Sequence, residues 1–263
     1  MSTKQRYIHQ KILSSSQNSS TEICYDQMEK RTVVLKKFPK NVKPLDRFLE
    51  EVNAQAFVSS TGVIQTYSAF EENDNYVLVM EAGKTNLMDI IKHGCLSETL
   101  VKTLLPNVLV GLKDLHSNHI IHNDVKPENI VLCLDGKMKI IDFDLATIHD
   151  QEKCNYQHGV FGTWPYMSPE VVDGGDHTEK VDVWSMGVVM FVALTGVLPF
   201  EAPNQTTYLD NVKQQPFNKI LLEKVHCSRQ LIDLISLMLT KDPSKRPTIN
   251  QCLKHEWFNS YSY

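Results

Sequence analysis

Two neighbouring segments constrain this chain more than any other part of its sequence. The first reads I-H-N-D-V-K-P-E-N-I-V-L, and the second reads I-I-D-F-D-L. The first brings Asp124, Lys126 and Asn129 onto one short loop after an apolar helix. The second places Asp142 on a turn directly after an apolar strand. A carboxylate base, a cation, an amide and a second carboxylate form the set of groups that phosphoryl transfer requires.

Composition limits the kinds of protein that this chain can be. Its 263 residues, of which 42% are apolar and 22% are charged, are typical of a folded globular chain. The net charge of −4 gives no reason to expect direct binding to nucleic acid or to a membrane. We interpret the one basic cluster as a solvated edge rather than a partner site. It consists of Lys36, Lys37, Lys40 and Lys43.

The start of the chain and its cysteines predict an intracellular protein, cytoplasmic, nuclear or both. The first ten residues contain no apolar core, so we expect no signal peptide. The longest apolar run, 186–198, is about thirteen residues long, and a bilayer-spanning helix needs roughly twenty. The six cysteines are scattered without a C-x-x-C pair, as is typical of free thiols in a reducing compartment.

The apolar pattern changes from strands to helices near residue 83. Strands are expected at 32–38, 63–70 and 76–81, and a helix with an apolar stripe is expected at 45–58. After residue 83, Ser97 can cap a long helix that contains Pro106, which should bend it or cost it an internal hydrogen bond. Further helices are expected at 180–195, 230–239 and 249–254.

This change predicts an α+β fold with two lobes in a single domain, residues 1–263. A small, mostly antiparallel β lobe with one helix covers about 1–81, and a larger helical lobe covers about 85–263. A hinge at about 81–84 joins them, and the cleft between lobes is where we expect a ligand.

These residues, in this order, resemble the eukaryotic protein kinase family over nearly the whole chain. Lysine two residues after Asp124, and the segment F-G-T-W-P-Y-M-S-P-E that ends at Glu170, are similar to serine/threonine kinases of the calcium/calmodulin-dependent type. The resemblance implies the bilobal kinase fold and transfer of the ATP γ-phosphate to protein serine or threonine. It also implies ATP and Mg²⁺ as cofactors, with Mn²⁺ as a substitute for the metal.

The resemblance assigns roles to the residues of both segments. Asp124 matches the catalytic base, and Lys126 matches the lysine that neutralises the γ-phosphate. Asn129 and Asp142 match the two magnesium ligands, an oxygen set suited to a hard cation. Thr163 matches the residue that contacts the base and favours serine or threonine substrates.

Lys36 matches the lysine that holds the α- and β-phosphates, and it needs a carboxylate partner in the next helix. Glu51 aligns best without gaps, and Glu50 stays open as the alternative. In the larger lobe, Asp182 resembles the acid that anchors the catalytic loop. Glu170 is expected to form a buried ion pair with the arginine of K-R-P-T, Arg246. His122 is interpreted as a packed core residue without a proton-transfer role.

The resemblance also places an adenine pocket at the hinge. Met80 matches the residue at the back of the pocket, and Glu81 and Ala82 would offer backbone groups to adenine. Val34 and Val131 would lie on either side of the ring.

The phosphate-binding loop departs from the family. Residues 13–21 read L-S-S-S-Q-N-S-S-T, without the glycines that let backbone amides approach phosphate. Ser14, Ser16 and Ser19 fall where those glycines belong. Their hydroxyls could help to bind phosphate, or the segment could be an ordinary polar loop, and both interpretations stay open. We expect weakened or unusual ATP binding.

Two further departures concern control of activity. Asn123 replaces the arginine that pairs with a phosphorylated activation loop, and 148–162 contains no serine or threonine, only Tyr156. We therefore expect activity without phosphorylation of that loop. Asp144 replaces the glycine of the Asp-Phe-Gly turn and should restrict its motion. The sequence does not indicate whether the turn would be held in its active or its inactive state.

The expected partner is a protein substrate with a mild preference for basic segments. Glu128 is assigned to the nucleotide-facing residues, and it is also an acid that would meet an arginine of the substrate, whereas Asn86 replaces a second such acid. The triplet His-Asn-Asp and the ending K-H-E-W-F resemble the stand-alone kinases of insect baculoviruses, which act on a small Arg-rich DNA-packing protein. The alternative function is a pseudokinase that binds ATP as a scaffold or activator. A kinase of small molecules is disfavoured by the complete substrate-binding segment. The oligomeric state is not indicated.

Overall fold

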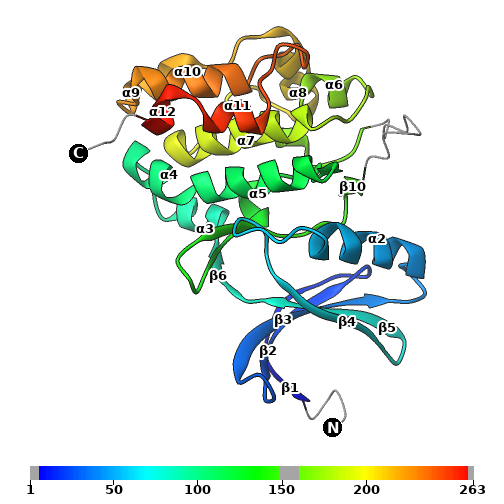
Figure 1. Ribbon diagram of the computed structural model, residues 1–263. Coiled ribbons are helices and arrows are strands. Elements are labelled where there is room, and N and C mark those ends of the chain that lie inside the picture. Colours follow the sequence, from blue (N-terminus) through cyan, green and yellow to red (C-terminus); the bar gives the residue numbers. More distant parts are fainter. Residues whose placement is uncertain (1–5, 149–159, 260–263) are drawn as a thin grey trace.

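A five-stranded antiparallel sheet forms the first part of the chain in the computed structural model, which describes residues 6–148 and 160–259 (Figure 1). The strands are β1 (Tyr7–Ser15), β2 (Ser20–Asp26), β3 (Arg31–Pro39), β4 (Thr66–Glu72) and β5 (Asn75–Glu81), in the order β1-β2-β3-β5-β4. Side chains of β3 alternate between the two faces, as strand geometry requires. Val33 is buried in a cluster on one face, and Val34 is buried on the other face in a cluster that includes Cys133 of the later chain. This second face therefore adjoins the rest of the molecule.

Helix α2 (Leu45–Ala56) packs on this second face of the sheet. Phe48 stacks on Tyr76 with ring centroids 4.9 Å apart. The expected apolar stripe is partly wrong, because Leu45 is 45% exposed while Glu51 is buried. A carboxylate thus lies on the inward face of α2, where it must find polar partners.

Two small sheets follow the hinge, in the orders β6-β8-β9 and β10-β7. Their strands are β6 (Gly83–Asn86), β7 (Ile120–Ile121), β8 (Ile130–Cys133), β9 (Met138–Ile140) and β10 (Thr147–Ile148). Ile130 pairs with Ile140 in an antiparallel ladder. The residues just before β8 therefore lie beside those just after β9.

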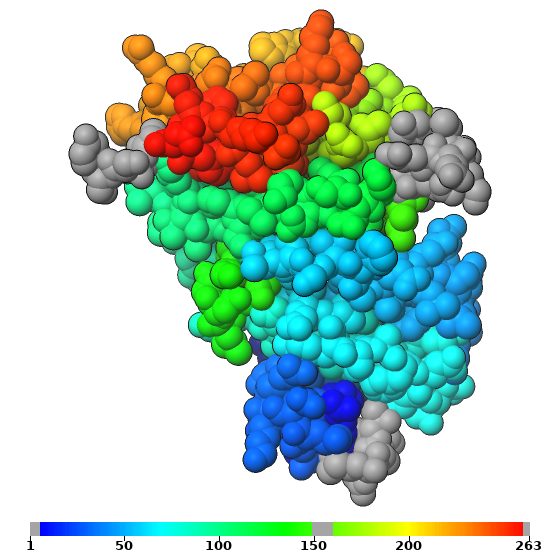
Figure 2. Space-filling model, in the orientation of Figure 1, coloured from blue at the N-terminus to red at the C-terminus, as the bar shows by residue number. Residues whose placement is uncertain are grey.

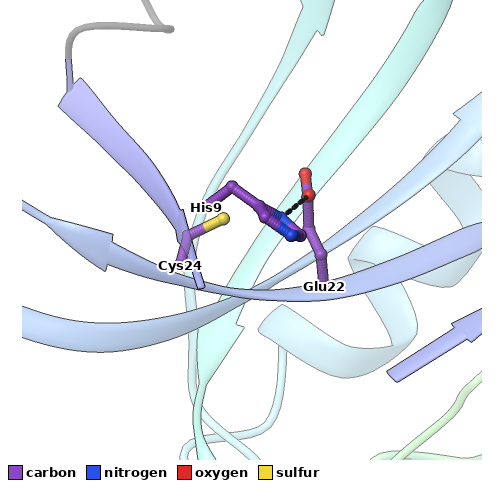
Figure 3. Close-up of side chains that lie close together, drawn as sticks. All are labelled: His9, Glu22 and Cys24. Carbon is purple, nitrogen blue, oxygen red and sulfur yellow. Dashed lines mark hydrogen bonds and ion pairs between the residues drawn. The ribbon is translucent and has the colours of Figure 1, made fainter. Parts of the chain in front are cut away.

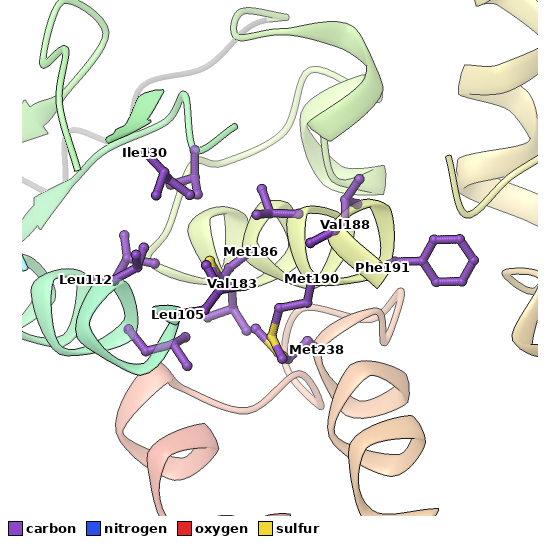
Figure 4. Packing of buried hydrophobic residues seen from close by; sticks show 14 of the residues in the cluster. Leu105, Leu112, Ile130, Val183, Met186, Val188, Met190, Phe191 and Met238 are labelled. Atoms are coloured by element: carbon purple, nitrogen blue, oxygen red, sulfur yellow. The ribbon is translucent and has the colours of Figure 1, made fainter. Parts of the chain in front are cut away.

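Helices form most of the remaining chain. They are α3 (Leu87–Lys92), α4 (Glu98–Leu104), α5 (Pro106–Ser117), α6 (Pro169–Val172), α7 (Lys180–Thr195), α8 (Gln205–Gln214), α9 (Lys219–Lys224), α10 (Arg229–Met238), α11 (Ile249–Leu253) and α12 (Glu256–Asn259), with short 3-10 helices η1 (Pro127–Asn129) and η2 (Trp164–Tyr166). Every residue of α7 from Val181 to Leu194 is buried, and neighbours pack around it (Figure 4). The described residues include no helix that is long and apolar enough to span a membrane.

The long helix expected around Pro106 is wrong: it consists of two helices. Helix α4 ends at Leu104, and α5 begins at Pro106. At the first position of a helix the missing proline N–H costs no internal hydrogen bond, and the fixed φ suits the helix. The proline therefore starts a new helix instead of bending an old one.

The segment between α2 and β4 touches α5 backbone against backbone. A Cβ on Gly62 would lie 2.0 Å from the carbonyl oxygen of Asn107, and a Cβ on Gly111 would lie 2.5 Å from the carbonyl oxygen of Gly62. The Asn107 side chain also donates to the carbonyl oxygen of Thr61 at 2.7 Å. This glycine contact, Gly62 against Gly111, joins the two parts of the molecule at a second place besides the hinge.

The arrangement confirms the predicted α+β fold with two lobes. We call residues 6–81 the sheet lobe, and residues 85–148 and 160–259 the helical lobe. In Figure 2 the sheet lobe (blue to cyan) forms one end of the molecule, and α10 to α12 (orange to red) lie at the opposite end.

Candidate active site

The catalytic loop, residues 122–129, holds the predicted base Asp124 together with Lys126 and Asn129. Lys126 Nζ donates to Asp124 Oδ2 at 2.6 Å and to Thr163 Oγ1 at 2.8 Å, and Thr163 Oγ1 donates to Asp124 Oδ1 at 2.7 Å. Asn129 Nδ2 donates to the carboxylate and the backbone oxygen of Asp124, both at 3.0 Å. The loop and the distant Thr163 therefore form one hydrogen-bonded group around the Asp124 carboxylate.

Asp142 lies just beyond the end of β9, beside Asn129. Its φ of 68° is a left-handed conformation that Asp tolerates better than most residues. The backbone N–H of Ile141 donates to the backbone oxygen of Asn129 at 2.9 Å, which fixes the two segments together. Asn129 Nδ2 donates to Asp124, and no residue of the described part of the chain donates to Asn129 Oδ1, so this oxygen can serve as a metal ligand. An amide oxygen and a carboxylate at adjoining strand ends are a donor set that suits Mg²⁺.

Lys36 contacts its predicted partner Glu51 and also Asp142, a contact that the sequence did not predict. Its Nζ lies 2.9 Å from Glu51 Oε1 and 2.7 Å from Asp142 Oδ1. Glu50 pairs with Arg47 at 2.9 Å on the exposed side of α2, so Glu51 is the partner and Glu50 is not. Burial favours neutral Lys36, but the charges of Glu51 and Asp142 outweigh it and raise the Lys36 pKa above its ordinary value.

Lys43 extends this group, which sequence reasoning missed. Its ammonium contacts Glu51 Oε2 and lies 2.5 Å from Asp144 Oδ1. The side chain of Lys43 is only 12% exposed, as is that of Lys36, so the interpretation of these lysines as a solvated edge is wrong. We call this series of alternating charges the ion-pair chain: Asp142, Lys36, Glu51, Lys43 and Asp144.

Asp182 anchors the catalytic loop from α7. Its buried carboxylate accepts hydrogen bonds from the backbone N–H groups of His122 and Asn123, both at 2.9 Å, and from His116 Nε2 at 2.8 Å. Burial would raise the pKa of Asp182, but these hydrogen bonds, led by that from His116, hold it below its ordinary value. The contact that the sequence predicted between Asp182 and the catalytic loop is confirmed.

The ring of His122 is fully used in packing and hydrogen bonding. Its Nε2 lies 3.0 Å from the carbonyl oxygen of Ile141, and its Nδ1 accepts from the Asp124 N–H at 3.3 Å. Phe143 packs edge-on against it, with ring centroids 5.0 Å apart, and is buried. The sequence left the state of the turn 142–144 open. Because the ring of Phe143 is buried, the turn directs the Asp142 carboxylate toward Lys36 of the sheet lobe.

Asn123 makes contacts that the sequence did not reveal. Its Nδ2 donates to the carbonyl oxygen of Leu145 at 2.9 Å and to Thr147 Oγ1 at 3.1 Å. Its Oδ1 lies 3.1 Å from Nδ1 of His177. A neutral amide thus ties the start of the activation segment to the catalytic loop. Tyr156, the predicted modifiable residue, lies outside the described residues.

The residues predicted to surround adenine come together at the hinge. Val34, Met80 and Ala82 are buried in one cluster, and Val131 packs against it. The carboxylate of Glu81 accepts two hydrogen bonds from Lys139 Nζ, both at 2.8 Å, and thereby ties the hinge to β9 of the helical lobe.

The glycine-free segment 13–21 is mostly strand, because β1 continues to Ser15 and β2 starts at Ser20. We call residues 16–19 the β1–β2 turn. The hydroxyl of Ser16 accepts from the backbone N–H groups of Asn18 and Ser19, both at 3.2 Å, and donates to the Ser19 carbonyl oxygen at 3.1 Å. Ser14 pairs with Thr21, which pairs with Lys36, so these three lie on one face of the sheet.

The remaining predicted residues occupy the helical lobe. Glu128 is exposed on η1. Asn86 caps α3 by accepting from the Asp89 N–H at 2.8 Å. The predicted ion pair is confirmed: buried Arg246 donates to both carboxylate oxygens of Glu170, at 2.6 and 2.9 Å. Such a bidentate pair fixes the position of α6, which contains Glu170.

A second group of potential metal ligands lies on the opposite face of the sheet (Figure 3). Ligand atoms of His9, Glu22 and Cys24 lie within 4.8 Å of one another. Glu22 already accepts from His9 at 2.7 Å and contacts Lys37. Cys24 is buried, which raises its thiol pKa to about 11. These groups are satisfied as an ion-pair network over an apolar cluster, on the face away from Lys36.

Comparison with known proteins agrees with this geometry. The family model described as "Protein kinase domain" matches residues 7–258. Serine/threonine-protein kinase cds1 of Schizosaccharomyces pombe is 33% identical over 249 residues, which cover 89% of this chain and 52% of that protein. Calcium-dependent protein kinase 6 of Plasmodium berghei is 36% identical over 240 residues, covering 87% and 15%. Aurora kinase of S. pombe is 31% identical over 238 residues, covering 89% and 63%. The chain therefore spans only part of the length of these relatives.

Proposed function

Because this chain belongs to the protein kinase family, we propose that it transfers the γ-phosphate of ATP to serine or threonine side chains of proteins. The observation that carries the proposal is the assembly of both halves of the site. Lys36, Glu51 and Asp142 form one ion-paired group, and Asp124 and Lys126 form another within hydrogen-bond distance of Thr163.

The residues present fit ATP and a divalent cation. The apolar cluster at the hinge, with Val34 and Met80, offers faces for an adenine ring. Asn129 and Asp142 offer oxygen ligands for Mg²⁺, with Mn²⁺ as a substitute. Bound Mg-ATP would supply the phosphoryl group and a metal that neutralises its charge.

The chain's own groups then perform three tasks. Lys36, kept charged by its two carboxylates, binds phosphate oxygens. Asp124 orients the substrate hydroxyl and accepts its proton at a carboxylate oxygen. Lys126 stays beside that carboxylate, at 2.6 Å, and offers positive charge to the phosphoryl group in transit.

Activity without phosphorylation of the activation segment is part of the proposal. Its support is the Asn123 amide, which already bonds Leu145 and Thr147. An arginine at this position would need a phosphate to balance its charge, whereas an amide needs none. Recombinant protein treated with a phosphatase should keep its full rate, as measured by phosphate transfer. Loss of the rate on treatment, with recovery on rephosphorylation, would contradict this.

The proposed substrate is a protein with basic segments, such as an Arg-rich DNA-packing protein, and the site of action is intracellular. Exposed Glu128 on η1 supports the first statement, because its charge can meet an arginine. The described cysteines are free thiols, which supports a reducing compartment.

The deciding experiment compares wild type with Asp124→Asn in a radiolabelled ATP assay on a basic protein. Removal of the base should lower kcat by about 10²–10⁴-fold while leaving nucleotide affinity nearly unchanged. Asp210→Asn, which alters an exposed residue of α8, serves as the matched control. Equal background transfer by wild type and Asp124→Asn would reject the proposal.

The alternative is a pseudokinase that binds ATP as a scaffold or activator. The β1–β2 turn favours it, because the amides of Asn18 and Ser19 are engaged by Ser16 and not directed to a phosphate. Nucleotide with Mg²⁺ should raise the melting temperature under both functions. Phosphate transfer that depends on Asp124 is the result that only the kinase predicts.

A further inference from the structure

We propose that Lys43 and Asp144 are positioning residues of this active site. Together they hold α2 and the turn 142–144 in the arrangement in which Glu51 reaches Lys36. The inference rests on the proposed function, since the positioned groups are those assigned to ATP.

Glu51 is the shared member of the arrangement. Its two carboxylate oxygens serve different lysines, Oε1 for Lys36 and Oε2 for Lys43, and its side chain is only 2% exposed. A buried carboxylate with one lysine would keep an unsatisfied oxygen, which is costly. Lys43 supplies the missing donor, and it carries the connection onward to Asp144 at 2.5 Å.

The position of Lys43 is restricted on its other side as well. Its Nζ lies 4.4 Å from the centroid of the Phe38 ring, and Lys36 Nζ lies 4.9 Å from the same centroid. An aromatic ring attracts cations at such distances. The two ammonium groups therefore share Glu51 and Phe38, and neither can leave without exposing a buried partner.

The carboxylate of Asp144 extends the ion-pair chain into the activation segment. Lys43 belongs to the link between β3 and α2, whereas Asp144 ends the turn that carries Asp142. Without the Asp144 carboxylate, Lys43 would hold α2 alone. With it, one cation connects the helix to the turn, at the edge of a cavity of about 510 Å³.

Two contacts then fix the start of the activation segment without any phosphate. The ion pair with Lys43 holds residue 144 from the sheet lobe, and Asn123 holds Leu145 and Thr147 from the catalytic loop. One ion pair and one neutral amide of the chain itself thus perform the task that a phosphate would otherwise perform.

Hydrogen exchange of the α2 peptide, residues 45–56, tests the proposal in the full chain. The proteins compared are wild type, Lys43→Met, Asp144→Asn and the double variant. Asp144→Asn should speed exchange in this peptide by about fivefold, the effect of a partly exposed ion pair. Lys43→Met should speed it at least as much, because it also leaves a buried oxygen of Glu51 without a donor. Because both changes remove the same link, the double variant should be no faster than Lys43→Met. Unchanged exchange in the single variants, or additive effects in the double variant, would overturn the proposal.

Matched variants separate this link from general effects on the helix. Arg47→Met breaks an exposed ion pair on α2 that does not reach the turn 142–144, so its effect should add to that of Asp144→Asn. Lys43→Arg keeps the charge and should exchange like wild type. Rising salt should narrow the gap between wild type and Asp144→Asn, since screening weakens an ion pair with an exposed partner.

A second readout follows phosphate transfer. Lys43→Met and Asp144→Asn should lower kcat by about fivefold and leave the KM for the protein substrate unchanged, because they displace Glu51 and not the substrate. Exchange is measured without substrate, so it decides the positioning role even in a protein that transfers no phosphate. Failure of the kinase proposal would appear instead as equal rates in wild type and Asp124→Asn.

Discussion

The catalytic loop and the β1–β2 turn belong to opposite lobes, and they are held in opposite ways. The loop is fixed from beneath by a buried carboxylate on α7, with Asp182 accepting three hydrogen bonds. The turn is closed by its own residue Ser16, and all its hydrogen-bonding groups named above lie on the surface. One element depends on contacts between residues about sixty positions apart, and the other on contacts within four residues.

Because of this difference, the catalytic groups and the part of the site expected to bind the nucleotide have separate structural support. Long-range buried contacts make the position of Asp124 part of the folded core. Local contacts leave the β1–β2 turn independent of that core, so its sequence can change without disturbing the base. The loss of glycines in the turn, beside an intact catalytic loop, is what such a separation permits.

The largest expected effect comes from Asp182→Asn, which breaks the support of the catalytic loop. An amide cannot accept from all three donors, and loss of a buried, hydrogen-bonded charge costs about 3–5 kcal/mol of folding free energy. Urea unfolding measures the loss, and phosphate transfer should fall with it. Asp233→Asn, at an exposed position of α10, is the control. A variant as stable as wild type would mean that the loop is held by other contacts.

The same carboxylate predicts a dependence on pH. Its pKa is lowered in the folded protein, so it stabilises the fold above the ordinary Asp value of about 3.9, and this stabilisation is lost as the pH falls through the folded pKa. The stability gap between wild type and Asp182→Asn should therefore be full near neutral pH and narrow in acid. A gap that is constant down to about pH 3 would assign the effect to packing instead.

An intermediate effect is expected for Asn123→Ala, which removes the tie between the catalytic loop and the activation segment. Leaving the buried partners of this amide unsatisfied costs about 1–3 kcal/mol. Asn118→Ala removes an exposed amide that bonds the Asp114 carbonyl oxygen, and it should cost less. Thermal unfolding compares the two. Equal losses would show that Asn123 does not act through its burial.

The smallest effect is expected for Ser16→Ala, which opens the β1–β2 turn. Loss of exposed hydrogen bonds costs about 0.5–1.5 kcal/mol at most, and the catalytic loop should not respond. Nucleotide affinity, measured by the shift in melting temperature, should change far less than in Lys36→Met. If both variants lost nucleotide affinity equally, the turn would contribute to nucleotide binding as much as Lys36 does. The proposed difference between the turn and the catalytic loop would then be wrong.

The sequence predicted those features in which local pattern and tertiary structure agree. Helix α7 has the predicted bounds 180–195, because its residues are apolar on every side. The ion pair of Lys36 with Glu51 followed from the family resemblance. Pattern alone placed the inward stripe of α2 correctly at Phe48 but wrongly at Leu45. The strands around the segment 13–21 were missed because its serines and asparagine favour turns.

Other features could not be read from local sequence. Lys43 and Asp144 lie about a hundred positions apart, and only the folded chain reveals that they meet. The sequence does not distinguish the four lysines within residues 36–43, yet two of them, Lys36 and Lys43, contact the buried Glu51. The contacts of Asn123 also could not be predicted from the local sequence. The substitution was visible, but the groups that its amide would bind were not.

The glycine contact also limits how the lobes can move. The sheet lobe is joined to the helical lobe covalently through the hinge, residues 81–84, and again where Gly62 lies against Gly111. If these two connections persist while the ion pairs of Lys36 with Asp142 and of Lys43 with Asp144 break, the sheet lobe keeps one rotation, about the axis through both connections. Opening of the nucleotide site would then be described by a single angle, with Lys36 and Asp142 separating while the two glycines stay in place. The hinge and the glycine contact define the rotation axis between the lobes, and a Cβ at either glycine would shift that axis.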